Sequence, residues 1–379
     1  MVDVLVIGDT VRSPELRHEI PLLVPDPFLY LEVGGERHVY VGSMEVPRIV
    51  GAAPSATVHP LEEVGLDELV AQGVPLDELP LELAVRACSA MGLRAAAVPR
   101  WFPAAYLDRL RAAGIELTVD QRPFDLRRRV KTSAELDGIR AAQRAAEAGF
   151  AAGVELLRAA EPRGEGLVLD GAPLTVERVK AAVAARFDEH GCIADEFVVA
   201  PAWQGAVGHH MGEGPIPAQV PVVFDLWPRD RATACFADMT RTVSVGDPGE
   251  EVRTWHGLTR EALEAARACV RAGVACQAVF DVVCDVYEAA GFPTQRTKRP
   301  GEVLADGFFH GLGHGVGLEV HEPPYLSRLP YGELVAGDVI TLEPGLYRRG
   351  LGGVRLEDLV LVTDDGCLTL TDASYELEV

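Results

Sequence analysis

Two pairs of carboxylates stand inside strand-like segments that are otherwise apolar, and they constrain the fold of this chain more than any other feature. Asp225 lies in Val-Val-Phe-Asp-Leu, and Asp238 follows thirteen residues later in Phe-Ala-Asp-Met-Thr-Arg-Thr. Glu343, in Thr-Leu-Glu-Pro-Gly, and Glu357, in Val-Arg-Leu-Glu-Asp, are fourteen residues apart. Because an uncompensated buried carboxylate costs on the order of several kcal/mol, these acids need either solvent or cations.

Each pair of acids belongs to a predicted β-hairpin, in which two strands rich in β-branched residues flank a turn. The predicted strands and turns are 221–227, 228–231 and 232–245 for the first hairpin, and 339–347, 348–353 and 354–362 for the second. Any one acid alone is explained by a solvent-facing position, or by pairing with Arg241 or Arg355. Four acids together favour two divalent cations, whose charge of +4 balances four carboxylates.

A nitrogen ligand is available in the glycine-rich segment 309–322, Phe-His-Gly-Leu-Gly-His-Gly-Val-Gly-Leu-Glu-Val-His-Glu. It holds His310, His314 and His321, and its glycines allow close backbone approach and argue against a helix. Three imidazoles in so short a segment favour a site over structural histidines. His209, in the loop before the first hairpin, is a further candidate.

The chain is expected to form two domains, residues 1–125 and residues 126–379. In the first domain short strands alternate with helices, which predicts a small α/β unit, and the basic stretch 122–131 is interpreted as a surface connector. Thr132 and Glu135 have the spacing of a capping box, and Asp247-Pro248 is interpreted as an N-cap followed by proline at the first helical position. The predicted helices of the second domain cover about 132–160, 176–189, 247–273 and 277–290. Two helix-plus-hairpin halves are therefore expected.

These motifs together resemble the "pita-bread" metallopeptidases of family M24, which include Xaa-Pro dipeptidases (prolidases), Xaa-Pro aminopeptidases and methionine aminopeptidases. The resemblance runs from about residue 130 to the C-terminus. It implies an α/β (α+β) fold with a pita-bread catalytic domain and a smaller creatinase-like N-terminal domain. It also implies five metal ligands: Asp225, Asp238, His314, Glu343 and Glu357.

The resemblance further implies roles for other residues and for the metals. His209, His310 and His321 match histidines that contact the metal ligands and the substrate, and Arg355 matches a residue that steadies a carboxylate ligand. Two divalent ions are expected, with Mn²⁺ as first choice and Co²⁺, Zn²⁺ or Fe²⁺ as alternatives. A hydroxide bridging them would attack the scissile carbonyl, Glu343 would move the proton toward the leaving nitrogen, and His321 would stabilise the oxyanion.

The expected substrate is a small peptide with proline at its second position, and the preferred function is hydrolysis of Xaa-Pro dipeptides. A dipeptidase must bind the substrate's own carboxylate, and Arg328 is the candidate, although a solvated loop arginine explains it equally. Tyr325 stands where many similar prolidases carry an arginine. Trp227 departs from the glycine usual in the family and is expected in the pocket wall. The alternatives are an Xaa-Pro aminopeptidase acting on longer peptides, a metal-free creatinase-type hydrolase and a non-catalytic binding module.

Composition limits the partners of this chain. With 35 Lys and Arg against 57 Asp and Glu, the net charge is −22, which disfavours nucleic acid and anionic membranes. Seven cysteines without CxxC spacing, and the absence of a signal peptide, indicate reduced thiols and the cytoplasm. A homodimer is expected from the resemblance alone.

Overall fold

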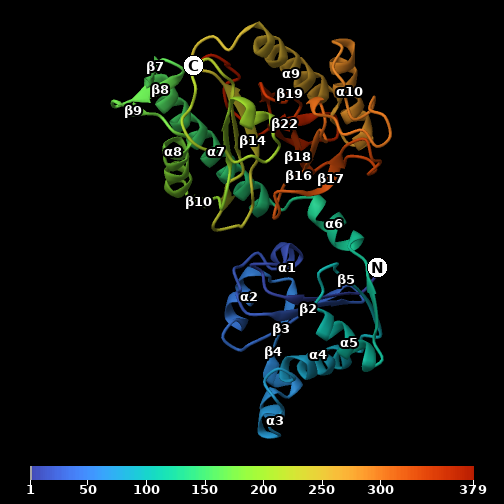
Figure 1. Cartoon of the computed structure of the whole chain (residues 1–379). Helices are drawn as coiled ribbons and strands as arrows, with labels where there is room; N and C mark the ends of the chain where they lie inside the picture. The colour runs from blue at the N-terminus through green and yellow to red at the C-terminus, as the bar shows by residue number, and fades with distance from the viewer. Residues whose placement is uncertain (1) are drawn as a thin grey trace. The chain divides into compact units, whose positions relative to one another are not determined.

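The computed structural model describes residues 2–379, which divide into two compact units, one ending at Arg128 and one spanning Arg129–Val379. The elements of both units are labelled in Figure 1. The boundary expected from the sequence, between residues 125 and 126, lies three residues before this division. All of the candidate site residues named above belong to the second unit.

The first unit is built on a six-stranded mixed sheet with the order β4-β3-β2-β1-β5-β6. Its strands are β1 (Val4–Gly8), β2 (Phe28–Val33), β3 (Glu36–Val41), β4 (Ala56–Pro60), β5 (Ala95–Val98) and β6 (Glu116–Val119). Its helices are α1 (Pro14–Glu19), α2 (Val46–Ala52), the 3₁₀ helix η1 (Leu61–Val64), α3 (Leu66–Ala71), α4 (Leu79–Ala90), α5 (Ala104–Ala112) and α6 (Arg122–Arg129). The small α/β character predicted for this region is confirmed.

Local sequence explains one turn of the first unit, whereas the stretch after its last strand departs from the prediction. The β2–β3 hairpin turns at Gly34-Gly35, whose positive φ angles of 60° and 89° suit glycine. The stretch predicted as a surface connector, residues 122–131, is instead largely the helix α6. Its composition misled the prediction, because Arg128, Arg129 and Lys131 are buried and not solvated.

The second unit contains four helices and several small sheets. The helices are α7 (Ser133–Ala159), α8 (Val176–Glu189), α9 (Glu250–Cys269) and α10 (Cys276–Ala289), with the 3₁₀ helix η2 (Ala202–Ala206). The strands of its first half are β7 (Glu161–Arg163), β8 (Gly166–Leu169), β9 (Ala172–Pro173), β10 (Cys192–Ile193), β11 (Val198–Pro201), β12 (Val222–Leu226), β13 (Arg229–Asp230) and β14 (Met239–Val243). The strands of its second half are β15 (Asp306–Gly307), β16 (Gly313–Gly315), β17 (Glu322–Leu326), β18 (Val339–Leu342), β19 (Gly345–Arg348), β20 (Gly352–Arg355), β21 (Asp358–Val362) and β22 (Cys367–Thr369).

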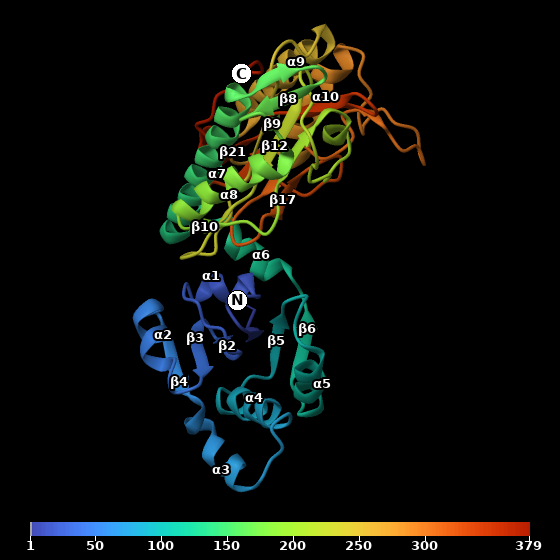
Figure 2. The same ribbon diagram turned by 60° about the vertical axis from the view of Figure 1, so that its left-hand side comes forward.

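The two halves of this unit repeat one design, in which a helix pair covers a sheet. Helices α7 and α8 run side by side, as Figure 2 shows, and share one apolar core with the sheet β11-β12-β14. Helices α9 and α10 share a second core with the sheet β17-β16-β18-β21-β22. In Figure 1 the strands lie between the two helix pairs. The predicted helix-plus-hairpin halves correspond to these two cores.

The helix ends test two predictions. The capping box of α7 is present: Thr132 Oγ1 accepts from the Glu135 N–H at 3.2 Å, and Glu135 Oε2 accepts from the Thr132 N–H at 2.8 Å. The prediction for Asp247 is wrong, because α9 begins later and Gly249 occupies its N-cap. Asp247 Oδ1 instead accepts from the Gly249 N–H at 2.7 Å, a local turn that precedes the helix.

The two predicted hairpins behave differently. Strands β12 and β14 pair in antiparallel fashion with Asp225 opposite Thr240, as expected for the first. In the second, β18 pairs with β21 in the larger sheet, whereas β19 pairs with β20 in a separate three-stranded sheet. Glu343 and Glu357 lie in the breaks between these pairs. The second hairpin therefore changes sheets at its two acids.

Within residues 2–379, no helix is long and apolar enough to cross a membrane. All seven cysteines are free thiols, and five of them are buried. The five buried cysteines are packed as small apolar side chains.

Candidate active site

The acid-bearing strands open onto a cavity of about 900 Å³. Eleven of the twelve site residues predicted from the sequence line it: His209, Asp225, Trp227, Asp238, His310, His314, His321, Tyr325, Glu343, Arg355 and Glu357. The fold thus brings together residues that are separated by more than a hundred positions in the chain.

Strand ends and breaks position the four carboxylates. Asp225 lies within β12, and Asp238 stands immediately before β14, its neighbour in the sheet. Glu343 follows β18 and Glu357 precedes β21, at the breaks of the second hairpin. Thr240, opposite Asp225, donates from Oγ1 to Glu357 Oε2 at 2.7 Å, so it ties the two hairpins together.

Three of the four acids, Asp238, Glu343 and Glu357, lie close enough together and far enough from solvent to resist ionisation. Burial, together with the negative charges of neighbouring acids, raises the pKa of Asp238 and of Glu343 well above the ordinary range. The same causes, burial first and then Asp225, raise the pKa of Glu357 to about 8. Asp238 Oδ1 is buried and accepts no hydrogen bond from the residues that the structure describes. A cation would satisfy this oxygen and remove the repulsion.

His314 is held with one ring nitrogen directed at the acids. Its Nδ1 donates to the Gly315 carbonyl at 3.1 Å, which leaves Nε2 as a lone-pair donor 3.7 Å from Asp238 Oδ2 and 3.5 Å from Glu343 Oε1. Burial lowers the pKa of His314 to about 3, so the ring is neutral. A Cβ on Gly313 would come within 2.1 Å of the Thr341 carbonyl oxygen, so only glycine fits beside the histidine.

This donor set fits a divalent metal. One ligand atom from each of Asp238, His314 and Glu357 lies within 4.8 Å of the other two. Glu343 reaches the same imidazole, and Asp225 lines the same cavity. Carboxylate oxygens with one imidazole nitrogen suit first-row divalent cations such as Mn²⁺, Fe²⁺, Co²⁺ and Zn²⁺.

Arg355 connects an acid to a histidine across the cavity wall. Its guanidinium forms an ion pair with Asp225 Oδ2 and donates from Nη1 to the Tyr347 hydroxyl at 3.0 Å. The hydroxyl in turn lies 2.9 Å from His310 Nε2, while His310 Nδ1 donates to the Gly311 carbonyl at 2.6 Å. Burial, followed by the charge of Arg355, lowers the pKa of His310 to about 3. His310 is therefore a neutral acceptor for the Tyr347 proton.

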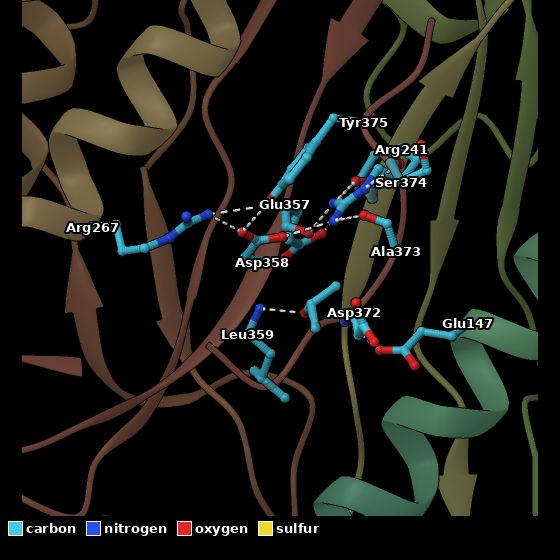
Figure 3. A network of polar contacts seen from close by, with 12 residues as sticks. Glu147, Arg241, Arg267, Glu357, Asp358, Leu359, Asp372, Ala373, Ser374 and Tyr375 are labelled. Atoms are coloured by element: carbon cyan, nitrogen blue, oxygen red, sulfur yellow. Dashed lines mark hydrogen bonds and ion pairs between the residues drawn. The ribbon is translucent and has the colours of Figure 1, made fainter. Parts of the chain in front are cut away.

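A second arginine fixes the backbone at Glu357, immediately before β21, as Figure 3 shows. Arg241 is fully buried, donates to Asp358 Oδ1 at 2.9 Å and to the Glu357 carbonyl at 2.7 Å, and stacks on the Tyr375 ring at 4.3 Å. Asp358 also accepts from the Tyr375 hydroxyl and from Arg267. The backbone of Glu357 is thus held by a paired and hydrogen-bonded network.

Three further predicted residues, His209, His321 and Tyr325, line the cavity. His209 has a φ of 60°, in the left-handed region, and the His321 ring lies 4.2 Å from the His314 ring between centroids. Burial, followed by the charge of His209, lowers the pKa of His321. Tyr325 lies on β17 and contacts the Tyr331 ring edge-on at 5.7 Å. Tyr325 and Tyr331 therefore contribute a pair of contacting aromatic rings to the cavity lining.

Arg328 is the one predicted site residue that the structure does not place in the cavity. Its neighbours Ser327 and Leu329 line the wall, whereas Arg328 is exposed and is not part of the lining. Arg328 was predicted to bind a substrate carboxylate because it lies close in sequence to Tyr325. Its side chain instead belongs to the solvated face of the segment.

Several functional residues were not predicted from the sequence. Tyr347, Met211 and Phe309 line the cavity but had been given no role, and neither had Thr240, which is not part of the lining and donates to Glu357. Tyr347 stands in Glu-Pro-Gly-Leu-Tyr, four residues after Glu343, so a strand alternation argument could have placed it near the site. No signal in the sequence identifies Met211.

Comparisons with known proteins identify a family for most of the second unit. The model of metallopeptidase family M24 matches residues 137–364, which is more than half of the chain. The Xaa-Pro dipeptidase of Pyrococcus furiosus is 38% identical over 141 residues, which are 37% of this chain and 37% of that protein. The matched region therefore spans little more than a third of this curated relative.

Solved structures of related proteins share the fold over nearly the whole chain. The prolidase of Pyrococcus furiosus superimposes with a TM-score of 0.75 at 22% identity, covering 99% of this chain and 97% of that one. The X-Pro aminopeptidase of Thermotoga maritima gives a TM-score of 0.78 at 21% identity, with the same two coverages. With the matched family model and the five converging metal-ligand candidates, these likenesses lead to one conclusion: the chain belongs to metallopeptidase family M24.

Proposed function

We propose that this protein is a metal-dependent peptidase that hydrolyses the Xaa-Pro bond of dipeptides, with Asp225, Asp238, His314, Glu343 and Glu357 as metal ligands. The observation that carries the proposal is the convergence of four carboxylates and one neutral imidazole on one cavity, with a buried oxygen of Asp238 left without a hydrogen bond. The dipeptide preference is supported by the name of the Pyrococcus furiosus relative, an Xaa-Pro dipeptidase.

The number of metal ions and their identity are also part of the proposal. Two divalent cations balance the four carboxylates, and Mn²⁺ is the first choice, with Co²⁺, Zn²⁺ or Fe²⁺ as alternatives. When bound, they supply Lewis-acid polarisation of the scissile carbonyl and a water nucleophile of lowered pKa.

The side chains of this protein do the remaining work. Glu343, with its side chain about 20% exposed, is the acid that can both reach His314 and exchange a proton with a substrate nitrogen in the cavity. His321 and His209 line the cavity with ring N–H groups that can stabilise negative charge developing on the carbonyl oxygen, while His310, whose two ring nitrogens are already engaged, positions the Tyr347 hydroxyl. Arg355 orients Asp225, and Trp227 and Tyr325 bound the substrate space.

A second candidate function is an Xaa-Pro aminopeptidase acting on longer peptides. The guanidinium in the cavity lining, that of Arg355, is engaged by Asp225, and Arg328 lies outside the lining. The volume of about 900 Å³ is near the upper end of the range of roughly 300–1,000 Å³ for ligand pockets. Both observations favour a peptide longer than two residues.

A substrate panel with metal add-back separates these candidates. Protein treated with a chelator and reloaded singly with Mn²⁺, Co²⁺, Zn²⁺ or Fe²⁺ is assayed on Ala-Pro and on Ala-Pro-Pro-Ala, with D238N as the variant lacking a ligand. Cleavage of Ala-Pro by the reloaded protein and not by D238N supports the dipeptidase. Cleavage of the tetrapeptide alone supports the aminopeptidase, and no metal-stimulated cleavage of either contradicts both.

The wider assignment is also proposed. We assign catalysis to the second unit and a creatinase-like role as accessory domain to the first. A homodimer and a cytoplasmic location remain predictions, the first of which light scattering on the purified protein would test.

A further inference from the structure

The first three residues of the second unit, 129–131, place two positively charged side chains in its interior. Lys131 Nζ forms an ion pair with Glu322 Oε1, and the two side chains are only 2% and 1% exposed. Arg129 pairs with Asp338 through two hydrogen bonds of 2.9 and 2.6 Å, and both partners are buried. Val130 between them is exposed. The ion-pair partners of these two side chains, Asp338 and Glu322, are not among the acids of the candidate metal site, so the proposed chemistry gives neither pair a role.

The partner of Lys131 is adjacent to a cavity residue. Glu322 is the first residue of β17 and directly follows His321, which lines the cavity together with Val320. Glu322 Oε2 also accepts from the Glu319 N–H at 3.4 Å. The carboxylate therefore holds both ends of the short loop that carries His321.

The packing around this ion pair is tight. A Cβ on Gly317 would lie 2.7 Å from Glu322 Oε1 and 2.8 Å from Lys131 Nζ, so the loop backbone rests directly on the pair. The Gly317 carbonyl accepts from the Phe236 N–H at 2.8 Å, which fixes the other side of the loop. A change in the pair is therefore transmitted to the loop by contact.

Arg129 holds the opposite part of the cavity edge in the same way. It donates to the Glu333 carbonyl at 2.8 Å, and its guanidinium lies 6.0 Å from the centroid of the Tyr331 ring. Asp338 Oδ2 accepts in addition from the Val335 N–H at 2.8 Å. Tyr331 lines the cavity with Leu329, so this segment too is fixed from residues 129–131.

We propose that Lys131 is a positioning residue for His321, acting through Glu322, and that Arg129 positions the cavity wall at Tyr331. Residues 129–131, at the start of the second unit, would thereby set the geometry of two sides of the cavity. A buried ion pair holds its geometry strictly, because either charge left alone in the interior is strongly unfavourable. The effect on turnover rests on the proposed function, whereas the effect on the loop does not.

The test compares K131M, K131R and E322Q with the control K180M. The control removes a Lys–Glu pair of 2.9 Å between Lys180 and Glu196 on the surface of the second unit. Backbone hydrogen exchange by mass spectrometry is measured over residues 316–322 and, for comparison, over α7. Steady-state kinetics on the Xaa-Pro substrate and metal content are measured on the same samples.

For K131M and E322Q we expect faster exchange in residues 316–322 with α7 unchanged, and a fall in kcat of about 10- to 100-fold at unchanged metal content. K131R should recover part of both, and K180M should match the wild type. R129K, which loses the paired hydrogen bonds, should raise KM more than it lowers kcat.

Two results overturn the positioning role of Lys131: wild-type exchange in residues 316–322 of both E322Q and folded K131M, or a wild-type kcat in folded, metal-loaded K131M. If K131M does not fold, E322Q and K131R carry the same comparison. An unchanged KM in R129K overturns the part assigned to Arg129. If the wild type cleaves no Xaa-Pro substrate while loop exchange changes as expected, the proposed function fails and the positioning role stands.

Discussion

Glu357→Gln is expected to stabilise the metal-free protein, although it removes a metal ligand. Glu357 is buried among other acids, and its pKa rises from 4.5 to about 8 on folding. Above pH 4.5 the unfolded chain has released this proton while the folded protein retains it, so the wild type loses stability as the pH rises from about 4.5 to about 8. Glutamine has no proton to release, and its side-chain oxygen can still accept from Thr240.

The size of the effect follows from the shift. Each pH unit above the unfolded-state pKa of 4.5 lowers the free energy of unfolding of the wild type by about 1.4 kcal/mol. Over the 2.5 units up to pH 7 the loss is about 3 kcal/mol. Metal-free E357Q should therefore exceed metal-free wild type by up to about 3 kcal/mol at pH 7, and the two should converge near pH 4. With Mn²⁺ present the order should reverse, because ligand binding stabilises the folded state of the wild type more strongly.

Urea unfolding followed by circular dichroism, on chelator-treated protein between pH 4 and pH 9, measures this difference. E264Q is the matched control, since Glu264 is exposed on α9 and should show no comparable gain. A metal-free E357Q that is less stable than wild type at every pH, or a difference that does not grow with pH, would refute the reasoning that repulsion and burial dominate at this site.

Three further predictions concern positioning and packing. R355M should lower activity and metal affinity by about 10- to 100-fold, measured by kinetics and metal titration, because Asp225 loses the guanidinium that orients it. G153A should destabilise by about 1–3 kcal/mol in urea unfolding, because its Cβ would lie 2.6 Å from a phenylalanine ring carbon, while G51A, at an open helical position, should be neutral or stabilising. T132A should cost about 1 kcal/mol in the same assay by removing the cap of α7.

The second unit was predictable where chemistry and local pattern agree. Four acids in apolar strands and a histidine in a glycine-rich segment have few other uses, and the structure gathers them around one cavity. The capping box at Thr132 depends only on residues close in the chain, and it formed as expected.

The errors arose where tertiary contacts decide the outcome. Asp247 has the sequence of an N-cap, but its side chain closes a turn one step earlier and Gly249 begins the helix. The basic stretch before Lys131 looked solvated because its buried counter-charges, Glu322 and Asp338, lie about two hundred residues away. Arg328 was predicted from the need for an arginine to bind a substrate carboxylate, and that need says nothing about the direction of its side chain.

The division of the second hairpin between two sheets has a consequence for tolerance to length changes. Strands β18 and β21 form one ladder on one side of Glu343 and Glu357. Strands β19 and β20 form a separate ladder on the other side of these two acids. The tip between β19 and β20, around Leu351, is exposed. Residues inserted there would lengthen a surface turn without shifting either ladder, so this tip is the natural place to attach a label or a fused domain while the acids stay in register.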